Sequence, residues 1–150
     1  MRFQEESYTN IKDDIKDLLK SHWEEVELYQ DDIEMNPDWD QYFKLSCLGV
    51  LRIYTARDED RLVGYCILLV NNSLHYKDRL LASCDLLYVK PEARKGLVGY
   101  NLIKYAEEKL KQIGVSVVQI NTKTYAPFDK LLERMDFSLI ERSYSKYIGN

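Results

Sequence analysis

At 150 residues the chain is long enough for one domain that buries roughly 70% of its unfolded surface. Its composition, 45% hydrophobic and 31% charged, is typical of a soluble globular protein, and its net charge of −4 gives no general reason to expect nucleic-acid or membrane binding. No apolar run approaches the length of a membrane span and the first ten residues lack the apolar core of a signal peptide, so we expect a cytoplasmic protein.

The first third of the chain predicts a short strand followed by two helices. Residues 2–7 fit an opening strand. Apolar residues at helical spacing predict an amphipathic helix over about 10–27, and 38–48 fits a second, short helix that ends at Gly49. The stretch between Glu24 and Asp40 carries eight acidic residues and no Lys or Arg, which indicates either a solvated surface or a rim that attracts a cationic ligand.

The middle of the chain predicts three strands. Residues 50–57 alternate and 61–70 form a continuous apolar run, and the turn between them makes an antiparallel hairpin the natural arrangement. After a loop, 80–89 form another apolar strand, which Pro91 ends.

The last third predicts a helix from about Val98 to Gly114, a strand over 115–122, a short helix over 126–135 and a last strand or strand pair over 138–149. The strand–helix–strand unit over 80–122 should be a right-handed parallel crossover. We therefore predict an α/β fold with a mixed sheet in a single domain, without internal repeats or linkers.

The residues offer few metal or nucleophile sites. Cys47, Cys66 and Cys84 are widely spaced without a C-x-x-C pair, which favours reduced thiols over disulfides or a zinc site. His22 and His75 are the only histidines, and no third ligand completes a metal site, so we expect no metal.

The segment "LYVKPEARKGLVGY" at 87–100 carries the clearest chemical pattern. A strand that leads straight into a helix leaves the first-turn amides of the helix without partners, and those amides bind anions well. Gly96 and Gly99 allow close approach of a ligand, and Arg94 and Lys95 add positive charge. The alternative is a basic turn whose glycines only ease packing.

The longer stretch "DLLYVKPEARKGLVGYNLIKYAEEKLKQIG" resembles motif A of the GNAT superfamily of acetyl-CoA-dependent N-acetyltransferases. This resemblance implies a mixed, mostly antiparallel sheet of about six to seven strands flanked by about four helices. More loosely, "HWEEV", "LHY", "NTKT" and "ERSYSKYIG" resemble small GNAT proteins of bacteriophages, which would place this protein in the host cytoplasm.

The resemblance implies acetyl-CoA as the cofactor and assigns its contacts. Backbone groups of Leu87, Tyr88 and Val89 would bind the pantetheine arm, and Lys123 would lie where the central strands separate around the thioester. The pyrophosphate would be held by Arg94, Lys95, Gly96, Leu97, Val98, Gly99 and Tyr100. Leu97 departs from the family pattern because it occupies the place of a glycine, so its backbone must avoid positive φ.

Acetyl transfer to an amine needs a base, and Asp85 is the candidate because it interrupts an apolar strand two residues before Leu87. The other interpretation is a carboxylate that only stabilises the fold, and Glu25 is the alternative base. The usual tyrosine acid of the family is replaced by Leu132. Tyr144 is our choice for the general acid, with Tyr125 and Tyr147 as substitutes.

The acceptor pocket would be bordered by residues from the first two helices and nearby strands, namely His22, Glu24, Glu25, Tyr65, Tyr76 and Thr122. We expect a primary amine, either a small molecule or an exposed amine of a protein, attacking directly in a ternary complex. The family also implies a possible homodimer. The alternative function is a non-catalytic docking protein of the same fold.

Overall fold

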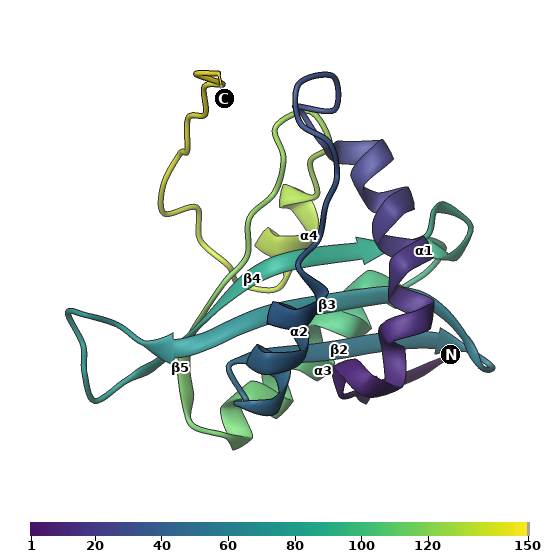
Figure 1. The fold of residues 1–150 in the computed structure, drawn as a ribbon. Helices are drawn as coiled ribbons and strands as arrows, with labels where there is room; N and C mark the ends of the chain where they lie inside the picture. Colours follow the sequence, from purple (N-terminus) through teal and green to yellow (C-terminus); the bar gives the residue numbers. More distant parts are fainter. Residues whose placement is uncertain (150) are drawn as a thin grey trace.

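The computed structural model describes residues 1–149, and its elements follow one another as a strand, two helices, three strands, a helix, a strand and a helix (Figure 1). In chain order they are β1 (Arg2–Glu5), α1 (Tyr8–Val26), α2 (Trp39–Cys47), β2 (Leu51–Asp58), β3 (Arg61–Asn72), β4 (Leu80–Val89), α3 (Val98–Gln112), β5 (Val115–Gln119) and α4 (Asp129–Arg134), with a 3-10 turn at Pro91–Ala93.

The five strands form one sheet in the order β1-β2-β3-β4-β5. Neighbouring strands are antiparallel except β4 and β5, which are parallel and are joined by the crossover through α3. The predicted mixed and mostly antiparallel sheet is therefore confirmed.

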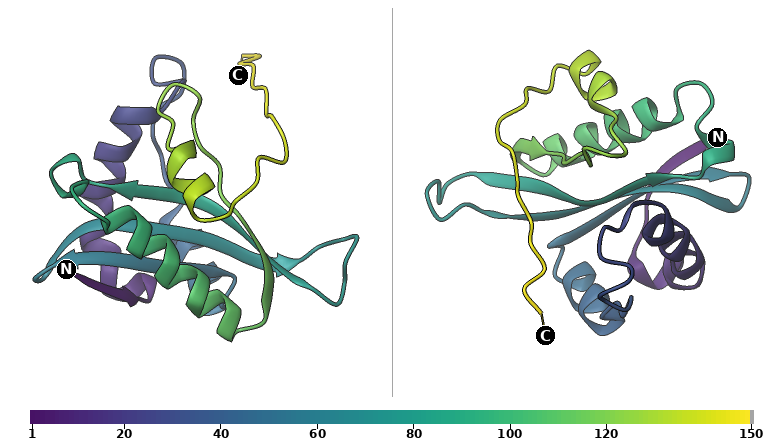
Figure 2. Two further views of the ribbon diagram at one scale, coloured as in Figure 1. Left: turned by 180° about the vertical axis from the view of Figure 1, so that it is seen from behind. Right: turned by 90° about the horizontal axis from the view of Figure 1, so that it is seen from above.

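Helices cover both faces of the sheet, with α1 and α2 on one side and α3 and α4 on the other (Figure 2). Each face has its own apolar core. Ile11, Ile15 and Leu18 of α1 pack on one face, and Leu102, Ala106 and Leu110 of α3 pack on the other. Within residues 1–149, no helix is both long enough and apolar enough to cross a membrane.

A β-bulge at Asp85 reverses the facing of β4 partway along the strand. Ile67 of β3 pairs with Leu86, whereas the next residue, Leu68, pairs with Cys84, so Asp85 is the extra residue. Before the bulge Cys84 faces α3, and after it Leu87 faces α3 while Leu86 faces α1. Bulges of this kind turn side chains towards a new direction and are common beside active sites.

The prediction of six to seven strands is wrong, because the part of the chain that the structure describes has five. The predicted last strand over 138–149 is absent from the sheet, and this segment runs as an irregular chain with Leu139 and Ile140 exposed. Its apolar residues do not alternate, since Leu139 and Ile140 are adjacent, so no single face of a strand would be apolar.

Candidate active site

The second half of β4 has an open edge. The ladder between β4 and β5 ends at Ser83 and Gln119, whereas the ladder between β4 and β3 continues to Val89. The amide of Lys90 donates to the carbonyl of Val63 at 2.8 Å. Because backbone groups alternate along an antiparallel ladder, the peptide groups of Leu87 and Val89 then face away from β3. An extended ligand can add to this edge as a further strand would.

The same alternation directs the N–H and C=O of Tyr88 towards β3, its partner being Tyr65. The backbone of Tyr88 is therefore used within the sheet, and only its side chain reaches the site. The side chain is buried among α1 residues.

The turn before α3 has the conformation that the sequence requires. Gly96 takes the positive φ of +71°, and Leu97 stays at φ −108° and ψ 22°, so the missing glycine at Leu97 causes no backbone strain. The left-handed residue of this turn is Gly96, which lies one position before the place of the motif A glycine, Leu97.

The N-terminus of α3 leaves its amides available for an anion. Leu97 is the N-cap residue and its side chain makes no capping hydrogen bond. The first intrahelical bond is donated by Asn101 to the carbonyl of Leu97 at 2.8 Å. The amides of Val98, Gly99 and Tyr100 therefore have no acceptor in the described residues, and together with the helix dipole they suit a phosphate.

Arg94 lies beside these amides but is turned back towards α1. Its Nε donates to the carbonyl of Val89 at 2.8 Å, and its Nη2 donates to Oε1 of Glu25 at 2.7 Å. The guanidinium also lies over the ring of Tyr88, 5.3 Å from the centroid. Arg94 thus ties the end of β4 to the last turn of α1, whereas the adjacent Lys95 is exposed.

Glu25 is a stabilised carboxylate. Burial alone would raise the pKa of Glu25, but hydrogen bonds from the hydroxyl of Tyr88, at 2.8 Å, and from Arg94 outweigh it and lower that pKa. A carboxylate of low pKa that already accepts two hydrogen bonds is a weak base. The geometry therefore favours Asp85 over Glu25.

His22 links the buried residues under this site. Its Nδ1 is 2.7 Å from the hydroxyl of Tyr65, and its ring stacks on Tyr88 with centroids 4.6 Å apart. Burial lowers the pKa of His22 to about 4, so the imidazole is neutral near pH 7. Tyr65 is fully buried, and burial raises the pKa of its hydroxyl, which stays protonated. Both side chains hold α1 on the sheet.

The loop after β5 closes on the end of α1. The hydroxyl of Tyr125 donates to the carbonyl of Val26 at 2.8 Å, and Oγ1 of Thr122 accepts from the amide of Phe128 at 3.0 Å. Lys123 pairs with Ala126 in an isolated bridge, and its charge adds to the lowering of the His22 pKa. The loop therefore lies next to His22, across the open edge from β4.

Asp85 lies on the other side of this edge, at a small cleft beneath α2. The cleft has a volume of about 140 Å³ and is lined by Asp38, Gln41, Tyr42, Leu45, Leu51, Leu69 and Asp85. Part of Asp85 is open to solvent, yet burial of its carboxyl is the cause of a raised pKa and no side-chain partner contributes. An unpaired carboxyl with a raised pKa suits a general base.

Three predicted site residues are not held at this position. Tyr144 is 91% exposed on the irregular C-terminal segment, because that segment does not join the sheet. Tyr76 is 66% exposed in the loop between β3 and β4, at the opposite end of β4 from Val89. Glu24 is exposed on α1, where only its backbone carbonyl accepts a bond, from Gln30.

The sequence predicted that the first two helices and the acidic stretch with Asp38 border the acceptor pocket, but it did not single out Tyr42. Asp38 and Tyr42 belong to the cleft, and Asp38 also caps α2 by accepting from the amide of Gln41 at 2.9 Å. The capping pattern predicts where the helix begins. It does not predict which strand the helix covers, so no local signal placed Tyr42 beside Asp85.

Comparisons with known proteins agree with this geometry. Residues 12–137 match the family model described as the acetyltransferase (GNAT) family. None of the curated proteins matches the chain. The bacteriophage resemblance stays a prediction.

Solved structures share the fold over nearly the whole chain. A ribosomal-protein-alanine N-acetyltransferase from Brucella melitensis biovar Abortus 2308 is 19% identical with a TM-score of 0.73, covering 99% of this chain and 100% of that chain. An aminoglycoside acetyltransferase from an uncultured soil metagenomic sample, in complex with sisomicin, is 14% identical with a TM-score of 0.73, covering 99% and 95%. A predicted acetyltransferase with acetyl-CoA from Clostridium acetobutylicum is 11% identical with a TM-score of 0.68, covering 98% and 96%.

Proposed function

We propose a function from one premise: the chain belongs to the acetyltransferase (GNAT) family and is an N-acetyltransferase. It transfers the acetyl group of acetyl-CoA to a primary amine, which attacks directly in a ternary complex. The observation that carries this proposal is the open edge of β4 leading to uncapped amides at the start of α3. The open strand edge suits the amide-containing arm of CoA, and the free amides of Val98, Gly99 and Tyr100, which follow it along the chain, suit the diphosphate. We call these three amides the anion seat.

The residues of the chain divide the binding of the cofactor between them. Leu87 and Val89 present backbone groups to the pantetheine arm, as a strand does to its neighbour. The amides of Val98, Gly99 and Tyr100 hold the pyrophosphate, and Arg94 adds a charged donor at the same turn. The carbonyl of Val89 already accepts from Nε of Arg94, which holds this side chain beside the end of β4.

Acetyl-CoA supplies an acetyl group activated as a thioester. Asp85 takes one proton from the ammonium of the acceptor, directly or through a water molecule, and thereby provides the neutral amine. The amine nitrogen forms a bond to the acetyl carbon and gives up its second proton to water, while the carbon–sulfur bond breaks and its electron pair leaves with the sulfur. The sulfur then takes a proton from water, because the exposed Tyr144 is not held near the site.

Kinetics of Asp85→Asn test the assignment of the base. We expect kcat to fall by about 10²-fold or more while the affinity for CoA is unchanged. The variant should also lose the acidic limb of the kcat/KM profile. In the parent protein that limb should lie above the usual carboxyl range, because Asp85 has a raised pKa and acts in its ionised form.

The matched control is Asp78→Asn, which removes the same charge from the exposed loop between β3 and β4. It should leave both kcat and the pH profile as in the parent. Equal kinetics for Asp85→Asn and the parent would remove Asp85 from the mechanism, and an absence of CoA binding at millimolar ligand would favour a docking role instead.

A further inference from the structure

The cleft beneath α2 is lined in part by the proposed base, Asp85, and by none of the residues proposed to bind the cofactor. Its floor is apolar, formed by Leu45 of α2, Leu51 of β2 and Leu69 of β3. Its polar residues lie at the rim, where Asp38, Gln41 and Asp85 are exposed. A ligand of this cleft therefore needs a hydrocarbon part between cationic groups.

The size of the cleft limits the width of that hydrocarbon part. Its volume of about 140 Å³ equals that of roughly five water molecules at about 30 Å³ each. This space accepts a short, unbranched carbon chain. It does not accept linked sugar rings, such as those of the sisomicin bound by the soil-metagenome relative.

The two carboxylates of the cleft lining favour a ligand with two cationic groups. Asp85 has no side-chain partner among the described residues that would lower its pKa. Asp38 uses only Oδ1 for its helix cap, which leaves Oδ2 for a ligand. Burial raises the pKa of Tyr42 to about 12, so its hydroxyl stays neutral near pH 7, and Asp38 and Asp85 are the charged groups of the cleft lining.

Resting on the proposed function, we infer that the acceptor is a free, unbranched aliphatic diamine that lies in the α2 cleft. One ammonium faces Asp85 and is the nitrogen that is acetylated. The carbon chain packs on Leu45, Leu51 and Leu69, and the second ammonium pairs with Asp38. A lysine side chain of a protein would place a neutral backbone at Asp38 and leave this carboxylate without a cationic partner.

Asp38→Asn gives a sharp test because asparagine is as good an N-cap residue as aspartate, so α2 keeps its cap and loses only the charge. For pentane-1,5-diamine, KM should rise about fivefold in this variant, whereas KM for pentylamine should not change. The matched control, Asp40→Asn, removes a charge from the same helical turn outside the cleft and should change neither value.

A series of acceptors tests the apolar floor. From propane-1,3-diamine to pentane-1,5-diamine, KM should fall about fourfold for each added methylene. The parent protein should acetylate pentane-1,5-diamine with higher kcat/KM than pentylamine, a lysine-containing peptide or sisomicin. Preference for the peptide or sisomicin, or equal KM values in Asp38→Asn and the parent, would overturn the inference and leave the acetyltransferase proposal standing.

Binding without turnover separates the two proposals. Titration of methyl-labelled protein with pentane-1,5-diamine alone should shift the methyl signals of Leu45 and Leu69. If no amine is acetylated, the proposed function fails. Shifted methyl signals would still support the diamine site, and unshifted signals at millimolar diamine would overturn it.

Discussion

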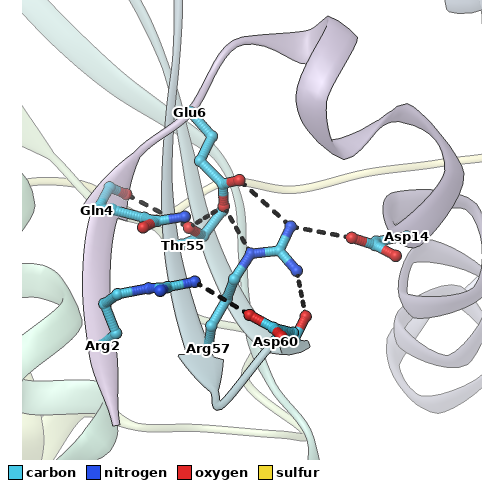
Figure 3. Close-up of polar contacts among 7 residues, drawn as sticks. All are labelled: Arg2, Gln4, Glu6, Asp14, Thr55, Arg57 and Asp60. Atoms are coloured by element: carbon cyan, nitrogen blue, oxygen red, sulfur yellow. Dashed lines mark hydrogen bonds and ion pairs between the residues drawn. The ribbon is translucent and has the colours of Figure 1, made fainter.

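Two arginine clusters in this molecule use the same ion-pair chemistry in opposite surroundings. Arg57 of β2 is 6% exposed and is bonded to polar groups from three other parts of the chain (Figure 3). Its Nε donates to Glu6 at 3.0 Å, its Nη2 to Asp14 at 2.9 Å and its Nη1 to the carbonyl of Asp60 at 2.7 Å. The Arg57 cluster joins β2 to the residue after β1, to α1 and to the β2–β3 turn.

The Arg94 cluster has fewer contacts and more solvent. The Arg94 and Glu25 side chains are 44% and 34% exposed, and the pair is completed by Tyr88 and the carbonyl of Val89. A buried pair is costly to break because it leaves a desolvated charge, whereas an exposed pair contributes about 0–1 kcal/mol. The first cluster is therefore a fixed part of the fold, whereas the second is weak enough for Arg94 to leave Glu25, as its proposed contact with phosphate requires.

Arg57→Gln should give the largest change in stability. It leaves the carboxylate of Glu6 buried without its main partner, which should lower the free energy of unfolding by about 3–5 kcal/mol. Urea denaturation of the variant and the parent measures this change. The double variant Glu6→Gln/Arg57→Met, which removes both charges, should recover part of the loss. A loss below 1 kcal/mol in the single variant would mean that the Arg57 cluster is as weak as the exposed one.

Arg94→Gln should change stability little and CoA affinity strongly, which is the opposite of what is expected for Arg57→Gln. The free energy of unfolding should change by no more than about 1 kcal/mol, because the ion pair is exposed. The Kd for CoA should rise about tenfold or more, since a charged donor to phosphate is lost. Calorimetric titration with CoA measures the second effect. Lys95→Gln, at the adjacent exposed position, is the control and should raise the Kd for CoA less. An unchanged Kd in Arg94→Gln would show that Arg94 does not bind the cofactor.

Glu25→Gln should produce the smallest effect. Glu25 competes with the phosphate for Arg94, so removal of its charge should lower the Kd for CoA by about fivefold at most. The same titration measures it, with Glu24→Gln on the exposed side of α1 as a control that leaves Kd unchanged. Weaker binding in Glu25→Gln would show that Glu25 holds Arg94 in its binding position instead of competing for it.

Local patterns in the sequence predicted most of the elements. The helix predicted over 10–27 is α1, Tyr8–Val26, and the strand predicted over 80–89 is β4, Leu80–Val89. These predictions succeeded because the spacing of apolar residues reflects burial on one side of a helix or within a sheet. The uncapped first turn of α3 was also predictable, since strand, turn and helix follow one another directly in the sequence.

Features that depend on tertiary register were not predictable. The bulge at Asp85 appears only when β4 pairs with β3, and the partnership of Arg94 with Glu25 joins residues 69 positions apart. The cleft beneath α2 likewise depends on which strands that helix covers. Tyr144 was chosen for its nearness in sequence to Leu132, and nearness in sequence did not predict that Tyr144 lies exposed on the irregular segment over 138–149.

The central claim is that the uncapped amides at the start of α3 hold the diphosphate of the cofactor. The most direct measurement is a titration of ¹⁵N-labelled protein with CoA, followed through the backbone amide signals. The largest shifts are expected at Val98, Gly99 and Tyr100, with the signal of Lys111 at the other end of α3 unchanged. Unshifted signals at these three amides in protein saturated with CoA, or no binding at millimolar CoA, would contradict it.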